Sequence, residues 1–203
     1  MRTVALATLL AAVFAASFAA HGRLEAHGAP RRSGFERALD RVAQEISGRS
    51  DVHVRCGPTF GAGVLGSVTF YGGRPGDEAL LAPQVCATLR RLWSTRRTPS
   101  LACTELGHGA CGREVIELAW AASALAHESY HLRGVRDEAA AECYGLQATA
   151  LAAEGVGAPA ADAQRLEDYT FWNVRPPVDG GYFSPECRDG GALDLRPGSP
   201  RWP

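Results

Sequence analysis

The sequence AWAASALAHESYHLRGVRDEAAAECYGLQ, residues 119–147, decides the fold that we expect for this chain. It contains the motif H-E-x-x-H, formed by His127, Glu128 and His131. Residues four apart lie on one face of a helix, so both imidazoles can bind one tetrahedral zinc ion at about 2.0–2.1 Å. Glu128 can then reach a water on that ion. The stretch therefore predicts a helix that binds zinc. The simpler alternative is that both histidines are ordinary polar residues of an amphipathic helix, paired with Glu138 and Glu142.

The flanking residues predict two helices joined by a short turn. The segment 114–132 contains no Gly or Pro and is rich in Ala, Leu and Glu, which favours a helix that ends at Gly134. Asp137 is a suitable N-cap for a second helix, which we expect to reach about Glu154. Because the link of residues 132–136 is short, the two helices should form an antiparallel hairpin.

The second helix carries the candidates for a third zinc ligand. Glu138 and Glu142 are four residues apart and lie on one face of it. The hairpin folds one or both of these carboxylates back toward the two histidines. A catalytic zinc site uses three protein ligands and keeps one position open. The residues alone leave open which carboxylate binds the metal.

These residues resemble the zincin metallopeptidases, in two alternative forms. In gluzincins a downstream helix supplies a Glu ligand and, four residues later, an acid that orients the first His. This resemblance implies Glu138 as the ligand and Glu142 as its supporter, with a much shorter spacer than in the large gluzincins. The metzincin pattern H-E-x-x-H-x-x-G-x-x-D makes Asp137 the third ligand. That form needs a downstream Met-turn and the only methionine is Met1, so we favour a compact gluzincin-like site.

The resemblance implies an exported zinc-dependent metallopeptidase that hydrolyses peptide bonds in an unidentified peptide or protein. Zinc would polarise the scissile carbonyl and activate a water, and Glu128 would act as the general base. Tyr182 and His108 are candidate donors to the transition state, with packing and surface roles as their simpler interpretations. The alternative function is a secreted, disulfide-stabilised binding or structural module with a non-catalytic metal site.

The N-terminus predicts export. Residues 4–20 follow Arg2 and form an uncharged run of mostly Ala, Leu, Val and Phe. The run is shorter than a comfortable transmembrane span and ends in small residues, as a signal peptide does. We expect residues 1–20 to be a cleaved signal peptide, with a membrane anchor that leaves the domain outside as the second interpretation. Either one predicts a secreted or extracellular domain.

The cysteines agree with export. All six lie beyond the export segment, and an even number in an oxidising compartment predicts three disulfides. Cys103 and Cys111 bracket a short loop and should pair. For the other four we predict the pairs Cys56–Cys86 and Cys143–Cys187. Because no C-x-x-C pair occurs, a thiolate zinc site is not expected.

Length and composition predict one globular domain with flanking segments. A chain of 203 residues can bury a core, and 46% hydrophobic with 21% charged residues is typical of globular proteins. The net charge of −1 and the dispersed basic residues give no indication of a nucleic-acid partner. We expect a flexible leader at 21–32, a metallopeptidase-like domain at 33–173 and a Pro/Gly-rich tail at 174–203 that is pinned to the domain.

Hydrophobic patterns outside the motif predict a mainly helical α+β fold. A helix should run from a cap at Ser33 to about Gly48. Alternating residues predict short strands, and Pro83 should start a further helix. The zincin resemblance implies an edge strand over the metal cleft, where a substrate can bind by strand addition. Val68 to Tyr71 is the candidate for it, and a purely structural strand is the alternative interpretation. The other expected elements are strands at 52–55 and 67–71 and helices at 84–95 and 160–172. Residues 78–81 could form a second strand or lead into the helix that follows.

Overall fold

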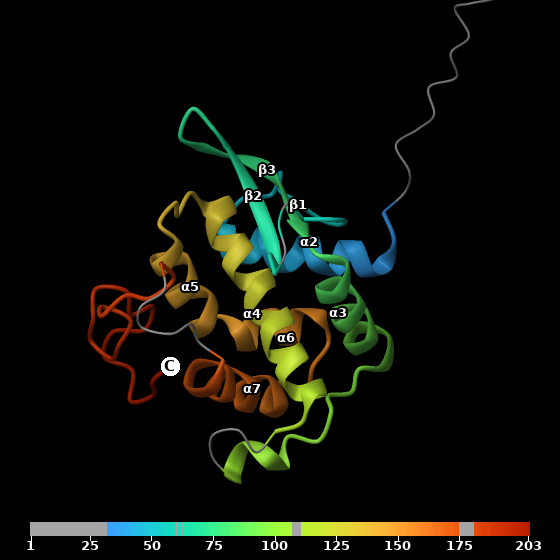
Figure 1. Ribbon diagram of the computed structural model, residues 1–203, viewed down its shortest axis with the longest axis vertical. Coiled ribbons are helices and arrows are strands. Elements are labelled where there is room, and N and C mark those ends of the chain that lie inside the picture. The colour runs from blue at the N-terminus through green and yellow to red at the C-terminus, as the bar shows by residue number, and fades with distance from the viewer. Residues whose placement is uncertain (1–31, 60, 62, 107–110, 175–180) are drawn as a thin grey trace, which may run out of the picture. The chain divides into compact units, whose positions relative to one another are not determined.

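A computed structural model describes residues 32–59, 61, 63–106, 111–174 and 181–203. Helices dominate these residues, and three strands form one small mixed sheet (Figure 1). The mainly helical α+β class predicted from the sequence is therefore confirmed. The elements in chain order are α2 (Gly34–Ser47), β1 (His53–Cys56), β2 (Gly66–Tyr71), β3 (Arg74–Leu81), α3 (Pro83–Thr95), the 3₁₀ helix η1 (Ala102–Leu106), α4 (Arg113–Arg133), α5 (Glu138–Gln147), α6 (Thr149–Val156) and α7 (Ala160–Asn173).

Helix α4 is the central element of the domain. It contacts α2, α3, α5, α6, α7 and the strands β2 and β3 (Figure 1). Most of its side chains from Val115 to Leu132 are buried, because neighbouring elements cover it on several sides. The helix ends at Gly134, whose φ of 109° lies in the left-handed region that favours glycine. The motif residues therefore sit on the most enclosed helix of the domain.

Helix α5 returns along α4 as the predicted hairpin. Its N-cap is Asp137, whose side chain accepts a hydrogen bond from the Ala140 amide at 2.8 Å. The two helix backbones approach closely at Gly145. A Cβ at this position would lie 3.0 Å from the backbone nitrogen and Cα of His127. The missing side chain of Gly145 thus lets α5 come close to the motif.

The predicted continuous helix to about Glu154 was wrong, because the chain breaks at Ala148 into α5 and α6. A side chain from another helix stabilises the start of α6 after this break. The buried carboxylate of Glu167 in α7 accepts a hydrogen bond from the Ala150 amide at 3.0 Å, in the first turn of α6. This contact satisfies an amide that the start of a helix leaves free.

The sheet has the strand order β1-β3-β2, with β1 parallel and β2 antiparallel to β3. The predicted strands at 52–55 and 67–71 match β1 and β2 to within one residue, with β2 beginning one residue earlier, at Gly66. The ambiguous segment 78–81 is the end of β3, which begins at Arg74. As an edge strand, β2 pairs with β3 alone in the described part of the chain.

The structure contains all three predicted disulfides, Cys56–Cys86, Cys103–Cys111 and Cys143–Cys187. They indicate an oxidising compartment. In the part of the chain that the structure describes, we find no helix that could span a membrane. The predicted signal peptide or anchor at 1–20 and nearly all of the leader at 21–32 lie outside the described residues.

The C-terminal tail is attached to α5 and α7. Besides the disulfide to Cys143, the side chain of Gln147 donates to the Leu193 carbonyl at 2.8 Å and accepts from the Leu195 amide at 2.9 Å. Arg196 donates to the buried Glu167 carboxylate at 2.9 Å. The ring of Trp202 packs on Phe171. These contacts fasten residues 187–202 to the domain.

Candidate metal centre

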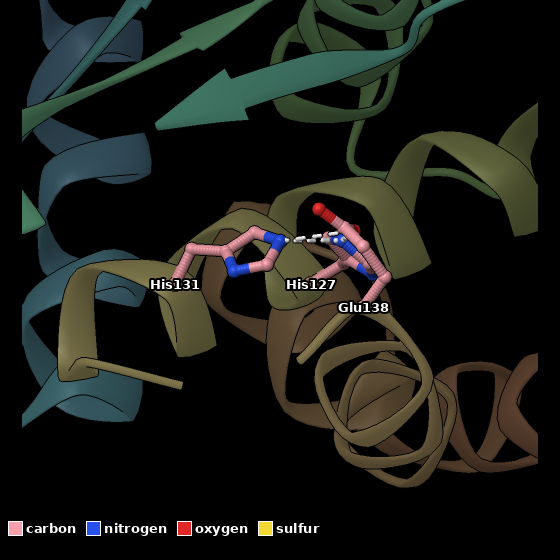
Figure 2. Close-up of side chains that lie close together, drawn as sticks. All are labelled: His127, His131 and Glu138. Carbon is pink, nitrogen blue, oxygen red and sulfur yellow. Dashed lines mark hydrogen bonds and ion pairs between the residues drawn. The ribbon is translucent and has the colours of Figure 1, made fainter. Parts of the chain in front are cut away.

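The two motif histidines lie next to each other on α4. His127 and His131 are both buried, and their Nε2 atoms are 2.9 Å apart. Glu138, the first residue of α5, brings its Oε2 atom to 3.2 Å from Nε2 of His127 and 3.3 Å from Nε2 of His131 (Figure 2). One helix thus supplies two nitrogen donors, and the turn to α5 supplies an oxygen donor.

The spacing of these three atoms fits zinc. Donor atoms around a tetrahedral zinc ion, with bonds of about 2.0–2.1 Å, lie about 3.3–3.4 Å from each other. The two distances to Glu138, 3.2 and 3.3 Å, agree with this value, and the distance of 2.9 Å between the two Nε2 atoms is shorter because the imidazoles hydrogen-bond to each other. Two imidazoles and one carboxylate are also a donor set that zinc accepts in catalytic sites, with one coordination position left open. His127, His131 and Glu138 are therefore suited to hold a zinc ion.

The outer ring nitrogens of both histidines have acceptors that orient the rings. Nδ1 of His131 lies 2.7 Å from the carbonyl oxygen of Val135, and Nδ1 of His127 lies 2.9 Å from Oε2 of Glu142. A carbonyl only accepts, so Nδ1 of His131 carries the proton and its Nε2 is free to bind a metal. Glu142 lies on the far side of the His127 ring from Glu138. The geometry thus favours Glu138 as the ligand and Glu142 as the group that orients His127.

Without a metal, the cluster retains a proton on His127. Burial lowers the pKa of His127, but hydrogen bonds with Glu138 and Glu142 and the charge of Glu128 outweigh burial and raise the pKa to about 10. The hydrogen bond from His127 in turn lowers the pKa of Glu138. An imidazole must be neutral to bind a metal, so this proton has to leave when a metal binds.

We expect zinc binding at neutral pH to release about one proton, because a free site with a His127 pKa of about 10 is still protonated there. The apparent affinity should then rise about tenfold for each pH unit, until the pH approaches this pKa. Isothermal titration calorimetry in two buffers of different ionisation enthalpy measures the proton count. Binding that releases no proton would contradict the described hydrogen bonding of His127.

Glu128 points into the space beside the histidines. Its side chain is buried, and its Oε2 atom has no hydrogen-bond partner among the described residues. Burial raises the pKa of Glu128 to about 7; the charge of His127 opposes this rise, and the charges of Glu138 and Glu142 add to it. A carboxylate with a pKa near neutrality and a free oxygen is suited to accept a proton from a water.

Gly66, the first residue of β2, packs directly against the Glu128 side chain and limits its position. A Cβ at Gly66 would lie 2.6 Å from Cγ and 2.7 Å from Oε1 of Glu128, closer than real contacts allow. Strand β2 begins at this residue, so the edge of the sheet touches the carboxylate directly. The sequence did not single out Gly66, because only the packing of β2 against α4 makes the position special.

Gly66→Ala should displace the Glu128 carboxylate and leave the zinc ligands in place. For the general-base role that the motif predicts for Glu128, a misplacement of about 1 Å would cost about 100-fold in rate, so we expect a loss of this order in kcat of the predicted hydrolysis. Steady-state kinetics and zinc analysis of the variant measure both properties. The same change at Gly72, which has open space around it, would strain a positive φ without touching the site and serves as a control for backbone effects. Equal losses in the two variants would contradict the positioning role of Gly66.

A cleft of about 1040 Å³ surrounds the cluster. Strand β2 runs over the two histidines and forms one wall, as the sequence suggested for Val68 to Tyr71 (Figure 2). The ring of Phe70 is perpendicular to the His131 imidazole, and the centres of the two rings are 6.0 Å apart. The lining further includes Trp120, Ser123 and Ala124 from α4 and Arg136 from the turn after it. The motif therefore opens onto a space large enough for several residues of a peptide.

The remaining predicted site residues have different positions. Asp137 caps α5 and does not belong to the metal cluster, which removes the metzincin-type alternative for the third ligand. Tyr182 lines the cleft, with its ring 6.0 Å from the His127 ring and about half exposed. Burial and nearby carboxylates raise the pKa of Tyr182, so its hydroxyl keeps its proton. His108 lies outside the described residues.

No known protein family, curated protein or solved structure matches the chain. The zincin resemblance therefore rests on the motif and on the following helix. It stays a prediction.

The division between Glu138 and Glu142 can be tested by metal affinity. We expect Glu138→Ala to weaken zinc binding more than Glu142→Ala, because only Glu138 offers an oxygen within 3.3 Å of both Nε2 atoms. Loss of an outer-shell partner such as Glu142 typically costs about 10–100-fold in affinity. Competition with a chromophoric chelator measures both variants. A larger loss in Glu142→Ala would exchange the two roles.

Proposed function

We propose that this protein is an exported zinc-dependent peptidase. The observation that carries the proposal is the placement of His127, His131 and Glu138, with donor atoms 2.9–3.3 Å apart beside the buried, unpartnered Oε2 of Glu128. The first three residues would hold the zinc ion. When bound, zinc would supply a Lewis acid for the scissile carbonyl and a water of lowered pKa.

Peptide hydrolysis adds the elements of water across the C–N bond, with a hydroxyl going to the carbonyl carbon and a proton to the nitrogen. Glu128 would take the proton from the attacking water on its carboxylate and then pass it to the leaving amine. Glu142 and the Val135 carbonyl keep the two imidazoles in orientation, through contacts of 2.9 and 2.7 Å. Tyr182 reaches the same cleft and is suited to donate to the carbonyl oxygen.

The cleft supports a peptide as the substrate. An edge strand forms its wall, and an extended chain can pair with an unpaired strand edge. Three disulfides and the predicted export segment fit a protein that acts outside the cytoplasm. The peptide-bond chemistry and the shape of the cleft thus point to the same class of substrate.

The proposal is tested by incubating the zinc-loaded protein with a mixed peptide library and reading the products by mass spectrometry. We expect new peptide ends that disappear when a chelator removes the metal and return when zinc is added. A protein that binds one equivalent of zinc and cuts no peptide would favour the alternative, a secreted binding module with a non-catalytic metal site.

A further inference from the structure

The cleft has an apolar end formed around Trp120. This tryptophan lies seven residues before His127 on the same helix, about 10.5 Å along the axis at 1.5 Å per residue. Trp120 and Ala124 share the α4 face of His127, and the indole is 47% exposed although it lines a cleft. Val64 and Leu65 line the same space. An exposed indole in a cleft that also has aliphatic lining is suited to bind a large apolar group.

Arg136 forms the other end of the cleft, in the turn between α4 and α5. Its guanidinium carbon lies 5.8 Å from the centre of the Phe70 ring, and that ring contacts His131. A Cβ at Gly73, in the turn between β2 and β3, would lie 3.6 Å from the guanidinium. The cation is thus held by an aromatic face and has no carboxylate partner among the described residues. Its hydrogen-bond donors are available to a ligand.

The charged residues are also distributed unevenly along the cleft. The acidic residues that line it, Glu128, Glu138 and Glu142, all belong to the metal centre. Arg136 is the only Lys or Arg among the described lining residues. A guanidinium can bind a carboxylate through two parallel hydrogen bonds, whereas a basic side chain at this end would meet like charge. An acidic group is therefore favoured at Arg136.

Strand β2 runs along the cleft toward its Arg136 end. It extends from Gly66, which touches Glu128, to Phe70 beside His131 and Arg136, and so it follows α4 in the same sense. A peptide paired with this edge at about 3.3 Å per residue would place a side chain near Trp120 about three residues from the metal. The same peptide would pass the metal centre and reach Arg136 on the far side.

We propose that the cleft selects an extended peptide with a large apolar side chain at Trp120 and an acidic group at Arg136, on opposite sides of the scissile bond. The acidic group is an Asp or Glu side chain or a C-terminal carboxylate, which share the chemistry that a guanidinium binds. This proposal rests on the proposed peptidase function for the position of the scissile bond. The recognition of the two groups by the cleft can be measured without cleavage.

The test uses the zinc-loaded full-length Glu128→Gln protein, so that peptides bind without being cut. The probes are labelled peptides that carry one Phe and one Glu at varied spacing, with matched peptides containing Gln for Glu or Ala for Phe. Fluorescence polarisation should show that Glu→Gln in the peptide weakens binding about tenfold or more. Arg136→Gln in the protein should abolish the difference between acid and amide, and Trp120→Ala the difference between Phe and Ala.

Arg133→Gln and Trp172→Ala are matched controls, because both residues are exposed and neither lines the cleft. Both controls should keep the two preferences. Peptides amidated at the C-terminus separate a side-chain acid from a terminal carboxylate as the bound group. The proposal is overturned if no peptide binds, if acid and amide peptides bind alike, or if the acid preference survives Arg136→Gln.

Cleavage by the wild-type protein separates this proposal from the proposed function. Product mapping should place the apolar residue on one side of the cut bond and the acid on the other. Cleavage without either preference overturns the selectivity and leaves the peptidase function standing. Selective binding without any cleavage overturns the peptidase function, and the recognition of the two groups then stands as the property of a binding module.

Discussion

Glu128→Gln is expected to lower kcat/KM for a cleaved peptide by about 10²–10⁴-fold, the contribution of a general base. The change removes the group that accepts the proton of the attacking water. An amide nearly matches the carboxylate in shape, so the contact with Gly66 and the volume of the cleft should be preserved. Glu128 does not belong to the cluster of His127, His131 and Glu138, and zinc content should stay at the wild-type value. Kinetics with the most rapidly cleaved peptide and elemental analysis measure the two properties.

Glu117→Gln is the matched control for this prediction. Glu117 lies on the same helix, and its carboxylate pairs with Arg113 at 2.6 Å away from the metal centre. This exposed i,i+4 pair contributes little to stability, so the control should retain both activity and zinc. A Glu128→Gln protein that cuts at the wild-type rate would exclude Glu128 as the base. Loss of zinc in that variant would instead show that the carboxylate supports the metal site.

The hairpin that carries the site was predictable because its signals are local. A run without Gly or Pro, the stop at Gly134 and the cap at Asp137 are read from neighbouring residues, and the structure contains α4 and α5 where these signals place them. The H-E-x-x-H spacing likewise fixes two imidazoles on one helical face. These parts of the fold need no knowledge of distant contacts.

The assignment of the third ligand was not predictable in the same way. Glu138 and Glu142 share a helical face, and only the register of α5 against α4 separates them. That register depends on the close approach of Gly145 in α5 to the backbone of His127 in α4, which is a contact between two helices. The helix break at Ala148 has the same origin, because Glu167 reaches the start of α6 from another helix. Local propensity favours a longer helix here, and a tertiary contact overrides it.

The sequence predicted only part of the cleft, the strand that covers the metal centre and Tyr182. Its walls come from residues 63–70, from the Trp120 face of α4, from Arg136 and from Tyr182. No spacing rule connects these segments, since their proximity follows from the packing of β2 over α4. Arg136 and Trp120 were therefore not candidate site residues at the level of sequence, although both line the cleft.

His131→Ala is expected to lower zinc affinity by more than about 100-fold, because loss of a ligand costs more than loss of an outer partner. His131 supplies one of three donor atoms, and the two that remain, on His127 and Glu138, cannot complete a site with three protein ligands. Zinc should also stop raising the melting temperature, since a ligand that binds only the folded state stabilises it in proportion to its affinity. Chelator competition and thermal unfolding with and without zinc measure these effects.

His53→Ala separates the loss of a ligand from the loss of any imidazole. His53 lies on β1, is about half exposed and faces Asp40 at 3.6 Å, away from the metal cluster. This variant should bind zinc as the wild type does and keep the zinc-dependent rise in melting temperature. If His131→Ala still bound one zinc with wild-type affinity, the metal would be elsewhere in the protein. In that case the 2.9 Å contact between the two imidazoles would be an ordinary hydrogen bond, with the proton of His127 shared between them.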